Sequence, residues 1–270
     1  MQGFEYHRPA SVADAVRAFG EAADGRPLAG GQSLLAAMKL GLSAPSALID
    51  LSRIDELRGV RVEGDRVVIG AMTTHATVAA SPELQRTIPG LAELAAGIGD
   101  RQVRAMGTIG GSVANADPAA CYPAAVLALG AEIRTDRRTI AGDEFFVGLY
   151  ETALEPDELI TAVAFPIPQK AAYIKFKQPA SRFALIGVCV AKTGAGARVG
   201  VTGAGACAFR ATPIEQALSA DWSPAAAERV QLPADGFNAD LHGSAEYRAH
   251  LVSVIAARAV ALADQLGSAR

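Results

Sequence analysis

Two short loops of similar composition constrain this chain more than any other feature. Residues 28–34 are Leu-Ala-Gly-Gly-Gln-Ser-Leu, and residues 108–115 are Thr-Ile-Gly-Gly-Ser-Val-Ala-Asn. Each glycine pair leads into a segment that we expect to be helical. Because glycine has no Cβ, backbone N–H groups there can approach a ligand closely, and N–H groups at a turn or helix start suit an anion such as phosphate. Two such loops could hold the two phosphates of a dinucleotide from two sides.

Neither loop is diagnostic by itself. A Gly-Gly pair is usually a turn, and a chain with 27 glycines contains some pairs by chance. Neither loop has the G-x-G-x-x-G spacing of a dinucleotide fingerprint or the G-x-x-x-x-G-K-[ST] spacing of a phosphate loop. From spacing alone, a phosphate site and an ordinary turn therefore both stay open at each loop.

Composition and charge exclude several classes of function. Half of the 270 residues are apolar and a fifth are charged, which is typical of a folded globular chain of one large or two ordinary domains. The net charge of −3 gives no electrostatic argument for nucleic acid or for an anionic membrane. We also expect no spanning helix and no secretory signal, because no apolar run approaches roughly 18 residues and the start lacks a basic, then apolar, segment.

The cysteines and histidines predict no metal centre on this chain. Cys121, Cys189 and Cys207 lie far apart, and none belongs to a C-x-x-C pair. The four histidines show no ligand spacing, so structural roles are expected for all of them. An odd, small number of cysteines without a disulfide framework suits a reducing cytoplasm, where we expect the protein.

The order of predicted elements indicates an α+β chain. Ser11 is expected to cap a helix with an apolar stripe from Val12 to Phe19, and Ser33 to cap a second helix at 34–40. With strands at 27–29 and 47–51, these helices predict a small β-α-β-α-β unit. The following segments predict two hairpins, helices and a strand, at 60–69, 73–80, 89–98, 123–129, 131–140 and 158–165.

The segment Pro166-Ile167-Pro168 is the strongest candidate for a domain boundary. Beyond it, successive strands at 172–177, 184–192, 198–201 and 206–209 and helices at 213–218 and 244–266 predict an α+β layer with a three- or four-stranded antiparallel sheet. We therefore expect a first domain at 1–168, with subdomains at about 1–56 and 57–168, and a second domain at 169–270.

The two loops resemble the two FAD-binding signatures of one family, the medium, flavin-carrying subunit of molybdenum hydroxylases of the xanthine dehydrogenase and carbon monoxide dehydrogenase type. The resemblance continues in the same order through nearly the whole chain. It includes residues 4–9, 48–51, 69–75, 99–104, 158–160, 177–184 and 243–248.

This resemblance implies a PCMH-type FAD-binding domain of two subdomains, followed by a C-terminal α+β domain of the carbon monoxide dehydrogenase flavoprotein type. It implies that FAD lies between the subdomains and that N–H groups and hydroxyls of both loops hold its pyrophosphate. The implied contacts in the first loop are Leu28, Ala29, Gly30, Gly31, Gln32, Ser33 and Leu34. Those in the second loop are Thr108, Ile109, Gly111, Ser112 and Asn115.

The resemblance also implies contacts outside the loops. Ile98 and Gly99 occupy the position where the family packs the adenine, and Ile160 and Lys177 match positions close to the flavin ring. A cation at the flavin's N1–C2=O2 or O4 edge would stabilise the anionic reduced flavin and raise its potential. A strand lysine that points to water is the alternative for Lys177. Cys121 stands where the family usually has an aspartate that accepts from ribityl or ribose hydroxyls, and a thiol is a weak substitute.

By the same resemblance, the chain is an electron-transfer subunit without a catalytic acid, base or nucleophile of its own. A large subunit with a molybdopterin cofactor would hydroxylate the substrate, and a small subunit with 2Fe-2S clusters would pass electrons to the FAD. The complex would be a heterotrimer, paired into a dimer of heterotrimers. Two other interpretations stay open: a stand-alone flavin oxidoreductase, and a flavin-free assembly scaffold, toward which Cys121 points.

Overall fold

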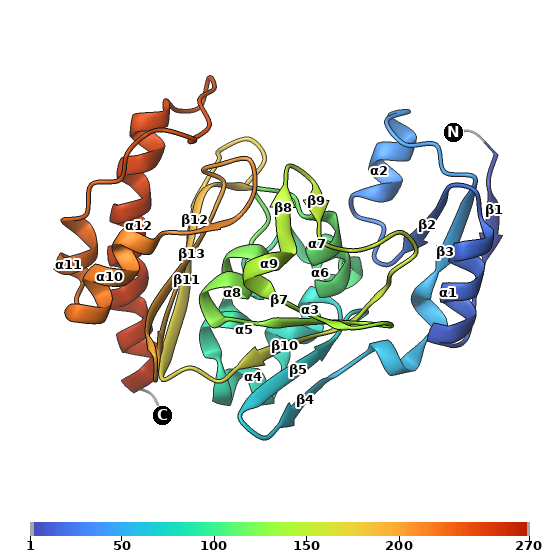
Figure 1. The fold of residues 1–270 in the computed structure, drawn as a ribbon, viewed down its shortest axis with the longest axis horizontal. Helices are drawn as coiled ribbons and strands as arrows, with labels where there is room; N and C mark the ends of the chain where they lie inside the picture. Colours follow the sequence, from blue (N-terminus) through green and yellow to red (C-terminus); the bar gives the residue numbers. More distant parts are fainter. Residues whose placement is uncertain (1–2, 269–270) are drawn as a thin grey trace.

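The computed structural model describes residues 3–268 and has the mixed α+β architecture expected from the sequence. Three parts follow one another across the molecule in Figure 1. A small parallel sheet with two helices forms the N-terminal part, a larger antiparallel sheet with several helices forms the central part, and a second antiparallel sheet with one long and two short helices forms the C-terminal part. Each part has its own cluster of buried apolar side chains.

The N-terminal part is the β-α-β-α-β unit predicted from the sequence. Its strands β1 (Glu5–His7), β3 (Ala47–Asp50) and β2 (Gly25–Leu28) run parallel in that order across the sheet. Parallel neighbours need a crossover connection, which α1 (Val12–Glu21) and α2 (Leu34–Lys39) supply. The side chain of Ser11 accepts from the N–H of Asp14, as predicted for an N-cap. The first glycine loop, residues 29–33, begins where β2 ends and leads into α2.

The central part is built on a five-stranded antiparallel sheet in the order β4-β5-β10-β6-β7. Both predicted hairpins are confirmed, and β10 from the end of the domain pairs between them. The strands are β4 (Val60–Glu63), β5 (Arg66–Gly70), β6 (Glu132–Thr135), β7 (Thr139–Ala141) and β10 (Ile160–Pro166). The helices are α3 (His75–Ala80), α4 (Pro82–Thr87), α5 (Pro89–Ala96), α6 (Arg101–Met106), α7 (Ile109–Asn115), α8 (Tyr122–Leu129) and α9 (Gly142–Phe145).

Short elements account for most differences from the sequence prediction. Helices α4 and α6 begin at side-chain caps, where Ser81 accepts from the N–H of Leu84 and Asp100 accepts from the N–H of Val103. Neither helix has enough turns to produce a clear apolar period. The hairpin of β8 (Phe146–Gly148) and β9 (Glu151–Thr152) and the helix α11 (Pro224–Glu228) were missed for the same reason.

The C-terminal part is a four-stranded antiparallel sheet, as predicted. Its strands are β11 (Lys170–Lys177), β12 (Ala184–Thr193), β13 (Gly196–Thr202) and β14 (Phe209–Arg210). One face carries α10 (Thr212–Ala220), α11 and α12 (Ala245–Ser268), and the other face lies against α5 and α8 of the central part (Figure 1). Gly200 allows close contact there, because a Cβ at that position would lie 2.1 Å from the carbonyl oxygen of Ala124. The sheet therefore packs directly on the central part.

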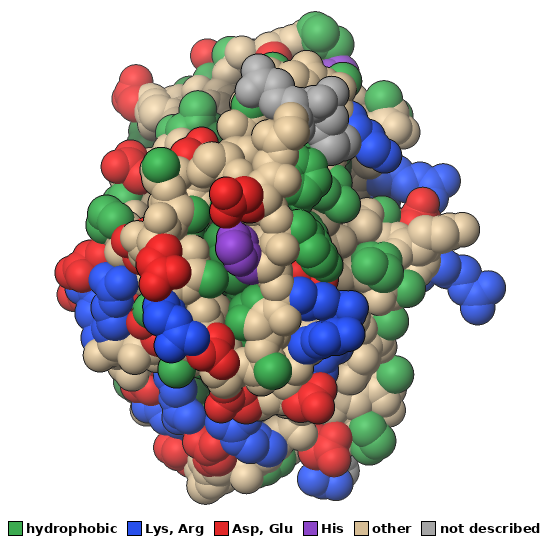
Figure 2. Space-filling view, turned by 90° about the vertical axis from the view of Figure 1, so that its right-hand side faces the viewer, with side chains coloured by type: hydrophobic (Ala, Val, Ile, Leu, Met, Phe, Trp, Pro, Cys, Tyr) green, Lys and Arg blue, Asp and Glu red, His purple; other side chains and the backbone are tan. Residues whose placement is uncertain are grey.

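The expectation that no helix is long and apolar enough to span a membrane does not hold for α12. Among residues 3–268, it is the one helix long and apolar enough by length and composition, but 56% of the qualifying stretch is buried inside the protein. It packs on β11 and β12 as a core helix does. On the face turned toward the viewer in Figure 2, which lies over the N-terminal part, basic and acidic side chains are interspersed rather than separated into patches of one sign.

Candidate functional site

The first glycine loop presents backbone donors without a protein acceptor. It turns at Gly31, which has φ +68°, between the end of β2 and the start of α2. Among residues 3–268, the N–H groups of Gly30, Gly31, Gln32 and Ser33 form no hydrogen bond to the protein. The loop is partly to fully exposed, so these donors can reach a ligand. The flanking predicted contacts, Leu28, Ala29 and Leu34, are half-buried at the ends of the two elements.

Ser33 does not cap α2, contrary to the sequence prediction. Its backbone is already helical, at φ −109° and ψ −52°, and its side chain accepts no cap hydrogen bond. A capping side chain needs an extended residue that turns its oxygen toward the first N–H groups of the helix. The exposed hydroxyl of Ser33 is consequently available to a ligand, together with the N–H groups of the loop.

The second glycine loop is organised differently. Thr108 is the N-cap of α7, and its hydroxyl accepts from the N–H of Gly111 at 3.1 Å. The N–H of Ile109 donates to Thr73 and that of Gly110 to Ala71, because the first turn of α7 is docked on the loop that follows β5. The expectation that these N–H groups point at a ligand is therefore wrong for this turn. Ser112 and Asn115 are half-buried farther along α7, and the Ser112 hydroxyl forms no hydrogen bond within residues 3–268.

The two loops are in direct contact, and glycine makes this contact feasible. A Cβ on Gly30 would lie 2.2 Å from the carbonyl oxygen of Met106 and 2.6 Å from the Cα of Gly107. A Cβ on Gly111 would lie 3.4 Å from the Cβ of Ala29. The structure thus brings the two sequence motifs, 78 residues apart between Gly30 and Thr108 (108 − 30), to one place. The result is a glycine-lined surface with free N–H donors on one side, which fits a phosphate-bearing ligand.

A buried histidine, His75, packs against Gly107, the residue before the second loop. His75 is 5% exposed, its backbone N–H donates to the carbonyl of Gly107, and its ring lies against Tyr122 with 5.4 Å between ring centroids. Burial, together with the nearby positive charge of Arg104, lowers the pKa of His75 to about 4. The imidazole is therefore neutral at physiological pH and serves as a packing group beneath Gly107.

The turn at 97–99, where the adenine was predicted, is held by two cations. Arg104 Nη1 donates to the carbonyls of Ile98 at 2.9 Å and Gly99 at 3.1 Å. Lys175 Nζ, from β11 of the C-terminal sheet, donates to the carbonyl of Gly97 at 3.0 Å and lies 3.4 Å from Cys121 Sγ. Lys175, which the sequence analysis missed, therefore links Cys121 to the turn that contains Ile98 and Gly99.

The two positions predicted near a flavin ring lie in different parts of the molecule. Ile160 begins β10 and is buried, at 4% exposure, in the central core. Lys177 ends β11 of the C-terminal sheet and is exposed. Lys175 and Lys177 are separated by one residue, the spacing of side chains that share a face of a regular strand, although the pairing of β11 with β12 shifts register between Phe176 and Lys177. That spacing, in a strand predicted from the sequence, was the available signal for Lys175.

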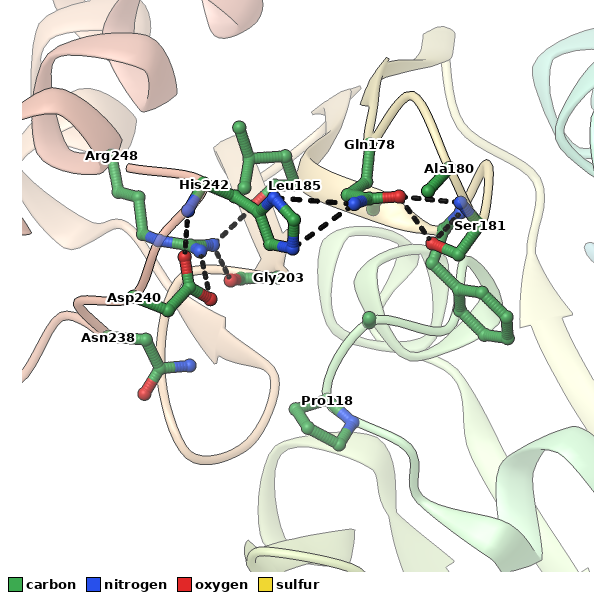
Figure 3. A pocket seen from close by; sticks show the side chains of 13 residues that line it. Pro118, Gln178, Ala180, Ser181, Leu185, Gly203, Asn238, Asp240, His242 and Arg248 are labelled. Carbon is green, nitrogen blue, oxygen red and sulfur yellow. Dashed lines mark hydrogen bonds and ion pairs between the residues drawn. The ribbon is translucent and has the colours of Figure 1, made fainter. Parts of the chain in front are cut away.

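A pocket of about 380 Å³ lies next to the end of β11, and Gln178, the residue after Lys177, is part of its lining. Its lining comes from the β11–β12 connection, from Pro118 and Ala119 after the second glycine loop, and from the segment before α12 (Figure 3). Arg248, 3% exposed, fixes this region by donating to the carbonyls of Leu185 and Gly203 and pairing with Asp240 at 2.7 Å. The Gln178 amide reaches the ring of His242 across the pocket (Figure 3).

The arrangement as a whole offers several features suited to binding a ligand. Among residues 3–268, no group of three His, Cys, Asp or Glu side chains could hold a metal ion. The loops supply donors and small residues, the turn at 97–99 supplies two cations, and the pocket supplies amide, hydroxyl and aromatic groups. A large anionic ligand with a planar end matches this combination of features.

Comparison with known proteins agrees with this description. The family described as "FAD binding domain in molybdopterin dehydrogenase" matches residues 2–168. The chain is 39% identical to the carbon monoxide dehydrogenase medium chain of Afipia carboxidovorans, with 95% of both chains covered. It is 35% identical to the nicotine 6-hydroxylase medium subunit of Paenarthrobacter nicotinovorans, with 96% of this chain and 97% of that chain covered.

Solved structures show the same fold over 98% of this chain. A chain in the cyanide-inactivated form of Cu,Mo-CO dehydrogenase superimposes with a TM-score of 0.88 at 37% identity, covering 98% of this chain and 99% of that chain. A chain of quinoline 2-oxidoreductase from Pseudomonas putida 86 superimposes with a TM-score of 0.87 at 29% identity, covering 98% of both chains.

Proposed function

The chain belongs to the family of FAD-binding medium subunits of molybdenum hydroxylases, and we propose that it is the electron-transfer subunit of such an enzyme. In this proposal it receives electrons from 2Fe-2S clusters on a small partner subunit and passes them to an external acceptor. The organic substrate reacts on a large partner subunit that carries the molybdopterin cofactor. The assembly is a dimer of heterotrimers in the cytoplasm.

The observation that supports this proposal most strongly is the contact between the two glycine loops. Gly30 lies against Met106 and Gly107, and the N–H groups at 30–33 beside this contact have no protein acceptor. Donors of this kind at the end of a parallel strand are suited to a pyrophosphate. When bound, FAD supplies the redox chemistry, and the protein positions it and tunes its potential.

The residues then divide into binding and framing roles. Gly30, Gly31, Gln32 and Ser33 bind the pyrophosphate through N–H groups and the Ser33 hydroxyl. Ser112 and Asn115 add side-chain contacts, while Thr108 and Ile109 hold α7 against the loop after β5.

The two ends of the cofactor lie outside the glycine loops in this proposal. Ile98 and Gly99 pack the adenine. Lys177 and the pocket beyond Gln178 receive the flavin ring, with Ile160 in the supporting core. The domain division proposed from the sequence, at residue 168, separates these loops from Lys177.

A visible absorption spectrum of the full chain, purified alone and after addition of FAD, tests the proposal. We expect the absorption bands of bound flavin, and their loss in Gly31→Val, because that residue has φ +68° and a Cβ would meet Leu35 Cδ1 at 2.8 Å. Gly194→Val is the matched control, because a Cβ at that turn position would meet no atom within 4 Å. A folded chain that binds no FAD would favour the scaffold interpretation instead.

Co-purification then separates the subunit from a stand-alone flavin enzyme. If the tagged chain is co-expressed with its partner subunits and purified through the tag, we expect iron and molybdenum in the purified material. Substrate-dependent flavin bleaching should require all three subunits. A yellow monomer that turns over an organic substrate without iron or molybdenum would contradict the proposal.

A further inference from the structure

We infer that Lys175 binds a phosphate of the cofactor, on the side of the site that holds the adenosine. The inference rests on the proposed function and adds to it a binding residue from the C-terminal sheet. Through this contact, FAD would tie the C-terminal part of the chain to the central part.

The first argument is the position of the Lys175 side chain. Along β11, Ala172 belongs to the apolar core of the C-terminal part, with Ile174 and Phe176 packed against it, whereas Tyr173 belongs to the central core. Because side chains alternate between faces, Lys175 shares the face of Tyr173 and points toward the central part. Its Nζ reaches one predicted cofactor position, Cys121, and the carbonyl of Gly97, which directly precedes the predicted adenine positions Ile98 and Gly99.

The second argument is the balance of charge at this turn. Lys175 donates to the carbonyl of Gly97, and Arg104 donates to the next two carbonyls. Among residues 3–268, neither cation forms an ion pair with a carboxylate. Two cations converging on one turn without an acidic partner create a positive potential, which favours an anionic ligand.

The third argument is the hydrogen-bonding capacity of the ammonium group. A lysine ammonium has three donors and no acceptor. One donor is used by the Gly97 carbonyl at 3.0 Å, and a second faces the thiol of Cys121 at 3.4 Å, which is a weak acceptor. At least one donor stays available for a strong, charge-assisted bond to a phosphate oxygen.

A purely structural role for Lys175 makes a different prediction. Gly97 follows the C-terminus of α5, where a cation interacts favourably with the helix carbonyls. If Lys175 only caps α5, replacing it would lower the stability of the apoprotein and weaken all flavins equally. If it binds a phosphate of the adenosine half, replacing it would weaken FAD but not FMN, which lacks that half.

The test compares the affinities of the full-length apoprotein for FAD and FMN in Lys175→Met, Lys175→Arg and the control Lys192→Met. Lys192 lies in the same sheet, with its Nζ 5.8 Å from the centroid of the Trp222 ring. We expect Lys175→Met to weaken FAD about tenfold or more, as for loss of a charged hydrogen bond, with FMN affinity unchanged. Lys175→Arg should retain most of the FAD affinity, and Lys192→Met should match the unaltered chain.

An unchanged ratio of FAD to FMN affinity in Lys175→Met would overturn the inference and leave Lys175 as a helix cap. Lys175→Gln is the second variant if the methionine variant does not fold, with urea unfolding of the apoprotein as the check. Failure of the unaltered chain to bind FAD at all would instead overturn the proposed function, and this inference with it.

Discussion

In the loop at residues 30–33 the backbone N–H groups have no acceptor within residues 3–268, whereas the N–H groups of residues 109–112 in the second loop are used within the protein. The two segments have similar sequences, but Thr108 and Ile109 are buried and Gln32 and Ser33 are exposed. The same Gly-Gly-polar pattern therefore serves two purposes. At the first loop it exposes donors, and at the second it lets α7 pack closely on the loop after β5 and on the first loop.

The largest expected effect on stability comes from a substitution of Gly110, which would disturb the packing of the second loop. A Cβ there would lie 2.5 Å from the Cβ of Ala71 and 2.7 Å from its carbonyl oxygen. We expect Gly110→Ala to lower the free energy of unfolding by about 3 kcal/mol, as for a serious overpacking of the core. Urea unfolding of the apoprotein measures this, with Gly194→Ala, where a Cβ meets open space, as the control. Equal stability of the two variants would show that the second loop is not a tightly packed frame.

A second large effect concerns the histidine beneath the second loop. Burial holds the pKa of His75 at about 4 in the folded chain, against about 6.5 when unfolded. Between these values the unfolded chain binds a proton that the folded chain does not, so stability falls as pH is lowered from 6.5 to 4 and levels off below. The full loss is about 3 kcal/mol. Stability measured against pH should show this slope in His7→Gln and lose it in His75→Gln.

These two cases indicate what the sequence could and could not predict. The β-α-β-α-β unit, both central hairpins and the C-terminal sheet followed from apolar periodicity and turn residues, because those signals are local. Two contacts depend instead on packing between segments that are distant in the sequence: Gly30 against Gly107, and Lys175 beside Cys121. The helices α4 and α6 were too short for a periodic signal, and the partners of the N–H groups at 109–111 depend on the docking of α7.

A smaller and sharper test exchanges hydroxyls for methyl groups in the two loops. Ser33→Ala should weaken FAD several-fold and leave stability unchanged, because the Ser33 hydroxyl makes no cap bond. Thr108→Ala should lower the free energy of unfolding by about 1 kcal/mol, as for a lost N-cap. Calorimetric titration with FAD and urea unfolding of both variants would separate the two roles. Similar losses of stability in both variants would remove the distinction between an open and a framed loop.

The smallest expected effect lies outside both loops, at Lys177. If its ammonium faces the flavin ring, Lys177→Met removes a charge that stabilises the anionic reduced form, so the midpoint potential falls. Because Lys177 is exposed, water screens the charge, and a change of well under 1 kcal/mol, roughly 10 mV for a two-electron couple, is expected. Spectroelectrochemical titration of the FAD-loaded chain detects this shift. Lys177→Arg should keep the potential, whereas an equal potential in all three proteins would place Lys177 in solvent, away from the ring. Because Lys175 is proposed to act on phosphate instead, Lys175→Met should change FAD affinity far more than the midpoint potential, which distinguishes the two lysines near the end of β11.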